Sequence, residues 1–266
     1  AMPSLRRSER HKIVSFLEEI LPRFPDTYFR LTFSIEGVGD DHDNLRSMPG
    51  SYKKIQKSYK IISPLRAKYP NLVLDCNSVF TTSSEIYLLD ALKTINKDFG
   101  FDNMSVTYAR GVIKDDSLKN VSKNRYKEIN KFLEEREKNK EKRLLYPLWR
   151  GVNSVSRENL MRTVFDDEFV TSCVAGRKLL VVSETGEVQP CEILGKSIGN
   201  LRNHDWDLKK LLKENSVNKM QKWIKETKCK CSFECALAAN VVWKPKNYPK
   251  VISSAIKNIG KSHLNH

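Results

Sequence analysis

The chain has 266 residues, enough for one large domain or two modest domains with cores of their own. Its hydrophobic content of 39% is typical of a soluble globular protein, and no apolar run approaches the roughly 20 residues that span a bilayer. No stretch resembles a secretory signal peptide. We therefore expect no membrane segment and a cytoplasmic location.

The charge is strongly positive, with 47 Lys and Arg against 32 Asp and Glu, a net charge of +15 and a pI near 9.5. Such a balance raises the hypothesis of nucleic-acid binding. However, the basic residues are spread along the chain and mixed with acidic ones, and no basic strip is interleaved with aromatic residues. This distribution is more typical of a solvated surface. Nucleic acid is therefore an unlikely partner on sequence grounds, whereas anionic substrates remain compatible.

The first half of the chain alternates predicted helices and strands. The helices have apolar residues three and four apart, and the strands are rich in β-branched and aromatic residues. In chain order these are a helix over residues 13–21, a strand over 28–35, a helix over 51–65, a strand over 72–80, a helix over 84–95 and a strand over 104–109. The alternation favours an α/β fold with a parallel sheet, whose functional residues collect at the carboxyl ends of the strands.

The second half is predicted to be mainly helical, with one β-hairpin. A charge-rich amphipathic helix is expected over residues 116–143, and another over 157–165 after a Ser156 cap. A hairpin is expected over 178–188, turning at Thr185-Gly186, because valines flank a turn dipeptide. Two further helices are predicted over residues 206–212 and 216–225.

Five of the six cysteines gather around this hairpin. Cys173 and Cys191 flank it, and a hairpin brings its two ends together. Cys229, Cys231 and Cys235 follow within one short segment. Disulfides are disfavoured in a chain without a secretory signal. Structural zinc and an iron–sulfur cluster both use several thiolates, so both remain open.

The spacing of these cysteines resembles the SPASM or twitch extension of radical S-adenosylmethionine (radical SAM) enzymes. The similar features are Cys173-x12-Gly186-x4-Cys191, the following Ile198-Gly199-Asn200-Leu201, and Cys231-x3-Cys235. The full pattern has a further Cys-x2-Cys and a later cysteine, for which only Cys229 stands in. The resemblance therefore implies one auxiliary [4Fe–4S] cluster, with Cys173, Cys191, Cys235 and one of Cys229 or Cys231 as ligands.

A second motif lies at the end of the first predicted strand. Ser34-Ile35-Glu36-Gly37, then His42-Asp43-Asn44-Leu45-Arg46 and Gly50, resembles the fourth-strand motif of radical SAM barrels. The resemblance implies that Ser34, Arg46 and Asn77 bind S-adenosylmethionine. Arg46 would pair with the methionyl carboxylate, and Asn77 would bind adenine or ribose. The structural alternative is that Glu36 and His42 cap a turn while Arg46 pairs with Asp43.

Together the two motifs imply a partial radical SAM (β/α)6 barrel over residues 1–145, of about the last three βα units. A small α+β SPASM/twitch-like domain with a hairpin would follow over residues 146–266. The family's Cys-x3-Cys-x2-Cys motif, which holds the cluster that cleaves the cofactor, is absent. We therefore expect the carboxyl-terminal portion of a longer enzyme, partnered by the missing amino-terminal half of the barrel.

Such an enzyme reduces S-adenosylmethionine to a 5′-deoxyadenosyl radical, which abstracts hydrogen from a substrate. The family resemblance implies a peptide, protein or small-molecule substrate. The alternative function is a zinc-stabilised, non-catalytic binding module.

Overall fold

The computed structural model describes residues 7–138 and 146–260, so the end of the helix predicted over 116–143 lies outside the described residues. The chain divides into two compact units. The sheet unit comprises Ala1–Ala109 and Ser117–Leu133, and the thiol unit comprises Arg110–Asp116 and Glu134–His266. Of the helices described, none combines the length and the apolar character needed to cross a bilayer.

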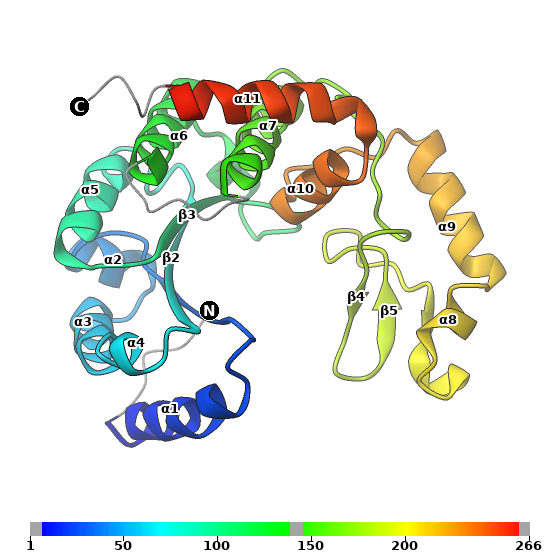
Figure 1. Ribbon diagram of the computed structural model, residues 1–266. Coiled ribbons are helices and arrows are strands. Elements are labelled where there is room, and N and C mark those ends of the chain that lie inside the picture. The colour runs from blue at the N-terminus through cyan, green and yellow to red at the C-terminus, as the bar shows by residue number, and fades with distance from the viewer. Residues whose placement is uncertain (1–6, 139–145, 261–266) are drawn as a thin grey trace. The chain divides into compact units, whose positions relative to one another are not determined.

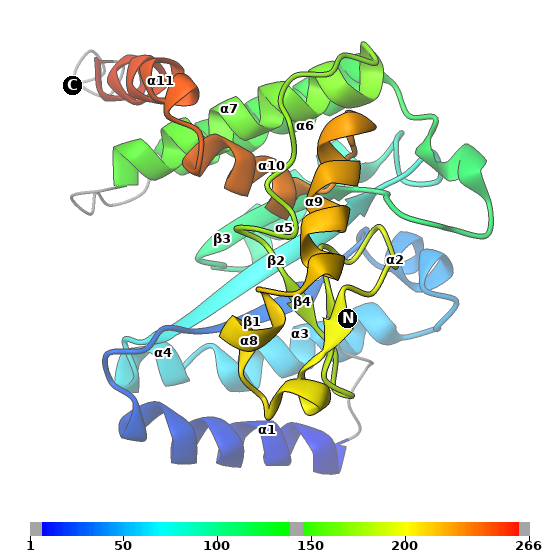
Figure 2. The ribbon, with the colours of Figure 1, turned by 90° about the vertical axis from the view of Figure 1, so that its right-hand side faces the viewer.

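The sheet unit is built on three parallel strands in the order β1-β2-β3 (Figures 1 and 2). They are β1 (Phe29–Ser34), β2 (Leu72–Phe80) and β3 (Asn103–Tyr108). In register, Ser34 pairs with Asn77 and Asn77 with Ser105. The predicted parallel α/β arrangement is confirmed, and each strand begins and ends within one residue of its predicted bounds.

Helices precede and follow these strands as predicted, with local differences in their bounds. The predicted 51–65 helix ends earlier because Pro64 cannot continue it, and a new turn begins after Pro64. A short helix also replaces part of the loop expected after β1, with three aspartates in its first turn. The elements are α1 (Arg7–Ile20), η1 (Leu21–Arg23), α2 (Asp40–Leu45), α3 (Ser51–Ile62), α4 (Leu65–Lys68), α5 (Leu88–Asp98), η2 (Asp116–Lys119) and α6 (Lys123–Lys138).

The two faces of this sheet differ in chemistry. One face is apolar and buried, and there Phe33 contacts Tyr59 of α3 at 5.9 Å between ring centroids. Cys76 lies fully buried on this face, as predicted for a core thiol. The other face carries Ser34, Asn77 and Ser105, which are partly or fully exposed. A polar face is uncommon in a parallel sheet, where helices usually cover both sides. This face is therefore the candidate binding surface of the sheet unit.

In the thiol unit, α7 (Tyr146–Phe165) contacts both α10 (Glu234–Val242) and α11 (Tyr248–Gly260). Gly151 permits the close approach of α7 and α11, since a Cβ there would lie 2.4 Å from the Val251 carbonyl oxygen.

The helix predicted over 157–165 is the second half of α7, which begins eleven residues earlier than expected. Ser156 is not its cap, because it lies inside α7 and donates to the Val152 carbonyl at 2.7 Å. Neither α10 nor α11 was predicted.

The hairpin forms where predicted. Strands β4 (Val181–Val182) and β5 (Glu187–Gln189) are antiparallel, and Gly186 turns between them at φ +83°. An unpredicted strand, β6 (Gly199–Asn200), pairs with the other edge of β5. The remaining elements of the unit are η3 (Leu201–His204), α8 (Leu208–Leu211), α9 (Asn215–Glu226) and η4 (Pro245–Asn247).

The start of the sheet depends on one buried amide. Asn71 is 7% exposed, and its Nδ2 donates to the carbonyl oxygens of Leu21 at 3.1 Å, Phe24 at 2.9 Å and Thr27 at 3.3 Å. These bonds fix the segment between α1 and β1 against the residue that directly precedes β2. The amide nitrogen carries two N–H donors and therefore suits converging carbonyl oxygens.

We predict that Asn71→Asp destabilises the protein by about 2–3 kcal/mol, because a carboxylate would face carbonyl oxygens it cannot bond. Urea denaturation measures the change. The exposed Asn124→Asp, in the first turn of α6, is the control and should alter the free energy of unfolding by less than about 0.5 kcal/mol. Equal stabilities for the two variants would contradict the prediction.

Candidate functional site

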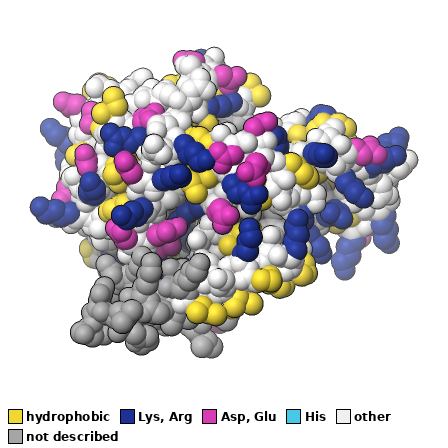
Figure 3. All heavy atoms as spheres, turned by 90° about the horizontal axis from the view of Figure 1, so that it is seen from above, with side chains coloured by type: hydrophobic (Ala, Val, Ile, Leu, Met, Phe, Trp, Pro, Cys, Tyr) yellow, Lys and Arg dark blue, Asp and Glu magenta, His cyan; other side chains and the backbone are white. Residues whose placement is uncertain are grey.

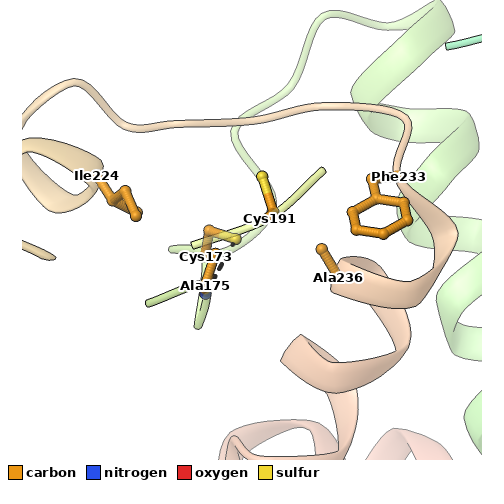
Figure 4. Close-up of a cluster of buried hydrophobic side chains, with 6 residues drawn as sticks. All are labelled: Cys173, Ala175, Cys191, Ile224, Phe233 and Ala236. Carbon is orange, nitrogen blue, oxygen red and sulfur yellow. Dashed lines mark hydrogen bonds between the residues drawn. The ribbon is translucent and has the colours of Figure 1, made fainter. Parts of the chain in front are cut away.

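The thiols of the second unit converge from two parts of the chain. Cys173 lies in the loop after α7 and Cys191 just after β5, and both are buried in one cluster. Figure 4 shows these two side chains adjacent, between Ile224 and Phe233. Cys229 and Cys231, from the loop between α9 and α10, pack against the same cluster. The hairpin flanks and the later loop thus meet.

Two of these sulfurs accept backbone hydrogen bonds in the same local geometry. The Ala175 N–H donates to Cys173 Sγ at 3.4 Å, and the Phe233 N–H donates to Cys231 Sγ at 3.5 Å. In both cases the donor lies two residues after the cysteine. Such bonds favour a charged sulfur and tune the potential of an iron–sulfur site. The local backbone therefore suits thiolate ligands.

The electrostatics also group four of the thiols. Burial raises the pKa of Cys173, and the neighbouring Cys191 raises it further. Burial likewise raises the pKa of Cys229, and the nearby Cys173 and Cys191 raise it further. The pKa of Cys231 is raised to about 11, chiefly by burial and then by the other three thiols. Four negative sulfurs held together here would repel one another, and a bound cationic centre would relieve that repulsion.

Cys235 lies in a different environment. The residue is exposed, although burial of its sulfur raises its pKa. Its charged neighbours are Arg110, Glu234 and Glu192, not the other thiols. The family resemblance included Cys235 with only one of Cys229 and Cys231, whereas the structure gathers both of those with the hairpin pair.

The thiols are gathered without forming a closed ligand shell. Within residues 7–138 and 146–260, no three His, Cys, Asp or Glu side chains are arranged to hold a metal ion. A pocket of about 10 Å³ lies beside Cys173, Cys229 and Cys231, with room for no more than about one water molecule. The segment that carries Cys229 and Cys231 has no helix or strand, and the Cys229 N–H donates to the Ile224 carbonyl at 3.1 Å. Soft thiolates suit zinc or iron–sulfur centres.

Two basic residues hold the segments around these thiols, and no sequence motif pointed to either role. Lys244 Nζ donates to Thr171 Oγ1 at 3.0 Å and to the Ser172 hydroxyl at 2.5 Å, just before Cys173. Arg110 binds Glu192 and Glu234, which adjoin Cys191 and Cys235. Long-range ion pairs leave no local signal in a single sequence.

In the sheet unit, two of the three residues predicted to bind the cofactor are neighbours. Ser34 and Asn77 are partners in the β1–β2 register. Asn77 Oδ1 accepts bonds from Ser105 Oγ and Thr107 Oγ1, both at 2.8 Å. These bonds orient the amide, so its Nδ2 donors point away from the two hydroxyls. The polar face of the sheet thus presents a row of hydroxyl and amide groups across the three strands.

The third residue, Arg46, forms an ion pair with Glu36 at 2.7 Å. Glu36 is buried, and its second oxygen accepts the Val79 N–H at 2.6 Å. The His42 ring Nδ1 accepts the Glu36 N–H at 3.0 Å. Burial raises the pKa of Glu36, although the Val79 N–H and Arg46 act against it. Glu36 and His42 therefore fix the turn after β1, and the arginine pairs with Glu36.

Asp43 has a separate role at the start of α3. Its carboxylate accepts the Gly50 N–H, the Ser51 hydroxyl and the Tyr52 N–H. These bonds lower the pKa of Asp43, with the Tyr52 N–H contributing most. The carboxylate of the His-Asp pair thus caps the next helix, and the structural alternative that paired it with Arg46 is wrong.

Comparison with known proteins gives similarity to solved structures only. No protein-family model and no curated protein sequence matches the chain. Native anSMEcpe with bound AdoMet and the Cp18Cys peptide is 16% identical, with a TM-score of 0.47 over 94% of this chain and 73% of that one. Native anSMEcpe with bound AdoMet is 17% identical, with a TM-score of 0.46 over 92% and 71%. At TM-scores below 0.5, these similarities carry no argument about function.

We predict that Glu36→Ala destabilises the sheet unit by about 1–3 kcal/mol, because it leaves the buried Val79 N–H without an acceptor. Since the pKa of Glu36 is raised above 4.5, its carboxyl contributes most below that pH and loses its contribution as the pH rises. The stability difference from wild type should therefore shrink with rising pH in urea titrations. Asp90→Ala, which removes an exposed pair with Lys93, should change stability by less than about 1 kcal/mol. A difference that grows with pH would contradict the assignment.

Alkylation of the metal-free, reduced protein should distinguish the thiols. Cys235 should react first with iodoacetamide because it is exposed, and Cys231 should react slowly at about pH 8 because little thiolate forms below its pKa of about 11. The Cys231 rate should keep rising towards that pH, whereas in urea it should level off near 9.0. Peptide mass spectrometry measures each rate. Equal rates at the two cysteines in the folded protein would contradict the structure.

Proposed function

We propose that this chain is the carboxyl-terminal portion of a radical SAM enzyme and carries one auxiliary [4Fe–4S] cluster. Residues 1–145 would contribute part of the barrel, and residues 146–266 the SPASM/twitch-like cluster domain. The observation that carries the proposal is the gathering of four thiols: Cys173 and Cys191 lie in one buried cluster, and the partly buried Cys229 and Cys231 pack against it. The parent enzyme would act in the cytoplasm, where thiols stay reduced, on a peptide, protein or small molecule.

The four gathered thiols would be the ligands of the cluster. Support comes from their shared burial, from the N–H donors to two of the sulfurs, and from the mutual effect on their pKa values. The five cysteines around the hairpin, Cys173, Cys191, Cys229, Cys231 and Cys235, are free thiols. Four thiolates are the usual ligand set of a cubane cluster. We assign Cys235 outside this set because its neighbours are charged side chains.

The polar face of the sheet would bind S-adenosylmethionine. Ser34 and Asn77 lie side by side there, and the Asn77 amide is oriented by two hydroxyls. Arg46 is one-third exposed while paired with Glu36, so its guanidinium is held in place and still reachable by a carboxylate. S-adenosylmethionine would supply the hydrogen-abstracting radical once its sulfonium bond is cleaved at the catalytic cluster. This chain has no Cys-x3-Cys-x2-Cys motif, so its own residues would bind and orient the cofactor without cleaving it.

A zinc-stabilised binding module is the second candidate. The same thiols favour it, since four cysteines also form closed structural zinc sites. Zinc binding in such modules supplies much of the folding free energy. The two functions differ in redox behaviour, because zinc does not change oxidation state.

Anaerobic reconstitution with iron and sulfide tests the proposal. We predict about four iron and four sulfide per chain and a visible absorbance that bleaches with dithionite. Replacing Cys173, Cys191, Cys229 or Cys231 with serine should abolish this absorbance, and Cys235→Ser should retain it. One tightly held zinc and no reducible chromophore would favour the binding module. Loss of the cluster in Cys235→Ser, with retention in either Cys229→Ser or Cys231→Ser, would overturn the proposed ligand set.

A further inference from the structure

Arg110 has three contacts, and each involves a residue next to a thiol or bonded to one. Its Nε and Nη2 donate to Glu192 Oε1 at 3.1 and 2.7 Å, and its Nη1 donates to Glu234 Oε2 at 2.7 Å. Glu192 directly follows Cys191, and Glu234 directly precedes Cys235. The guanidinium carbon also lies 4.8 Å from the centre of the Phe233 ring.

Phe233 connects this ion-pair network to the thiols. Its side chain is 3% exposed and packs in the same cluster as Cys173 and Cys191, as Figure 4 shows. Its backbone N–H is the donor to Cys231 Sγ. Arg110 therefore lies against the outer side of the residue that positions Cys231. It also joins the loop after β5 to the first turn of α10.

The geometry of this network differs from that of an ordinary surface pair. The Arg110 side chain is 24% exposed and uses both edges of its guanidinium on two carboxylates. A planar fork bound in this way restricts both partners, whereas lysine would place a single point charge between them. The two glutamates belong to segments separated by more than forty residues in the sequence. Their positions relative to each other thus depend on the arginine.

We propose that Arg110 is a positioning residue of the thiol site, which holds the Cys191 loop and the Phe233–Cys235 segment together so that the gathered thiols can close on one metal centre. The part that concerns metal loading rests on the proposed function. The part that concerns the two segments stands on the contacts alone. Arg110 binds no metal and acts through Glu192, Glu234 and Phe233.

The matched control is Arg157. It also pairs with two glutamates, Glu137 at 3.0 Å and Glu134 at 3.9 Å, and its side chain is 19% exposed. Its pairs join α6 to α7, and no cysteine adjoins either glutamate. Arg110→Met and Arg157→Met each remove one arginine and leave two carboxylates. The two variants should therefore lose similar thermal stability.

Two measurements on the full chain test the inference. In the metal-free protein, Arg110→Met should accelerate amide hydrogen exchange in residues 191–193 and 233–237, and Arg157→Met should not. In Co²⁺ titrations that follow the thiolate-to-metal absorption, Arg110→Met should bind about 10-fold more weakly than wild type, with Arg110→Lys in between and Arg157→Met unchanged.

Each outcome decides one part of the inference. Unchanged exchange in both segments of Arg110→Met would overturn the positioning role. If exchange changes in Arg110→Met but its Co²⁺ affinity equals that of wild type, Arg110 holds the two segments together in the fold only. Its proposed part in metal loading is then overturned. If wild type itself binds no Co²⁺ and assembles no cluster, the proposed function fails, and the exchange experiment still decides whether Arg110 holds the two segments together.

Discussion

The packing of the folded-back hairpin against the α9–α10 loop is the constraint on which the thiol unit depends. It brings Cys173 and Cys191 into one apolar cluster with Phe233 and Ala236. Burial makes thiolates costly there unless something neutralises them, and this is why the pKa values in the cluster are raised. The same burial would hold a soft metal centre away from solvent. Apolar packing and affinity for metal therefore have one structural origin in this unit.

Basic side chains around the cluster offset part of that cost. Burial is the largest influence on the pKa of Cys173, and Lys244 acts against it. Lys196 acts in the same way on Cys229, while its ammonium lies 3.9 Å from the centre of the Trp223 ring. Four thiolates around a [4Fe–4S] core leave a net negative charge, and nearby cations raise the reduction potential of such a centre. The positive charge of the chain would thus have a local use if the proposed cluster binds here. On the molecular face in Figure 3, by contrast, Lys and Arg are interspersed with Asp and Glu.

In the sheet unit, the buried residue Glu36 makes several structural contacts at once. Glu36 continues the β1–β2 pairing through its side chain, because Val79 donates to a carboxylate oxygen beyond the last residue of β1. The same carboxylate holds Arg46, and the backbone N–H of Glu36 orients His42. A motif that resembles a cofactor-binding sequence therefore also has a structural role. The two roles are compatible, because a cofactor-binding arginine must itself be held in position.

The sequence by itself determined the strands, the hairpin and the parallel sheet, because alternation of buried and exposed residues and a turn glycine are local signals. It also singled out the cysteines, since their spacing is visible without a fold. It did not reveal α10 or α11, both of which pack on α7. Only the tertiary structure separated Cys235 from the other four thiols and paired Arg46 with Glu36. Those outcomes depend on burial and on contacts between distant segments, and a linear sequence of residues records neither.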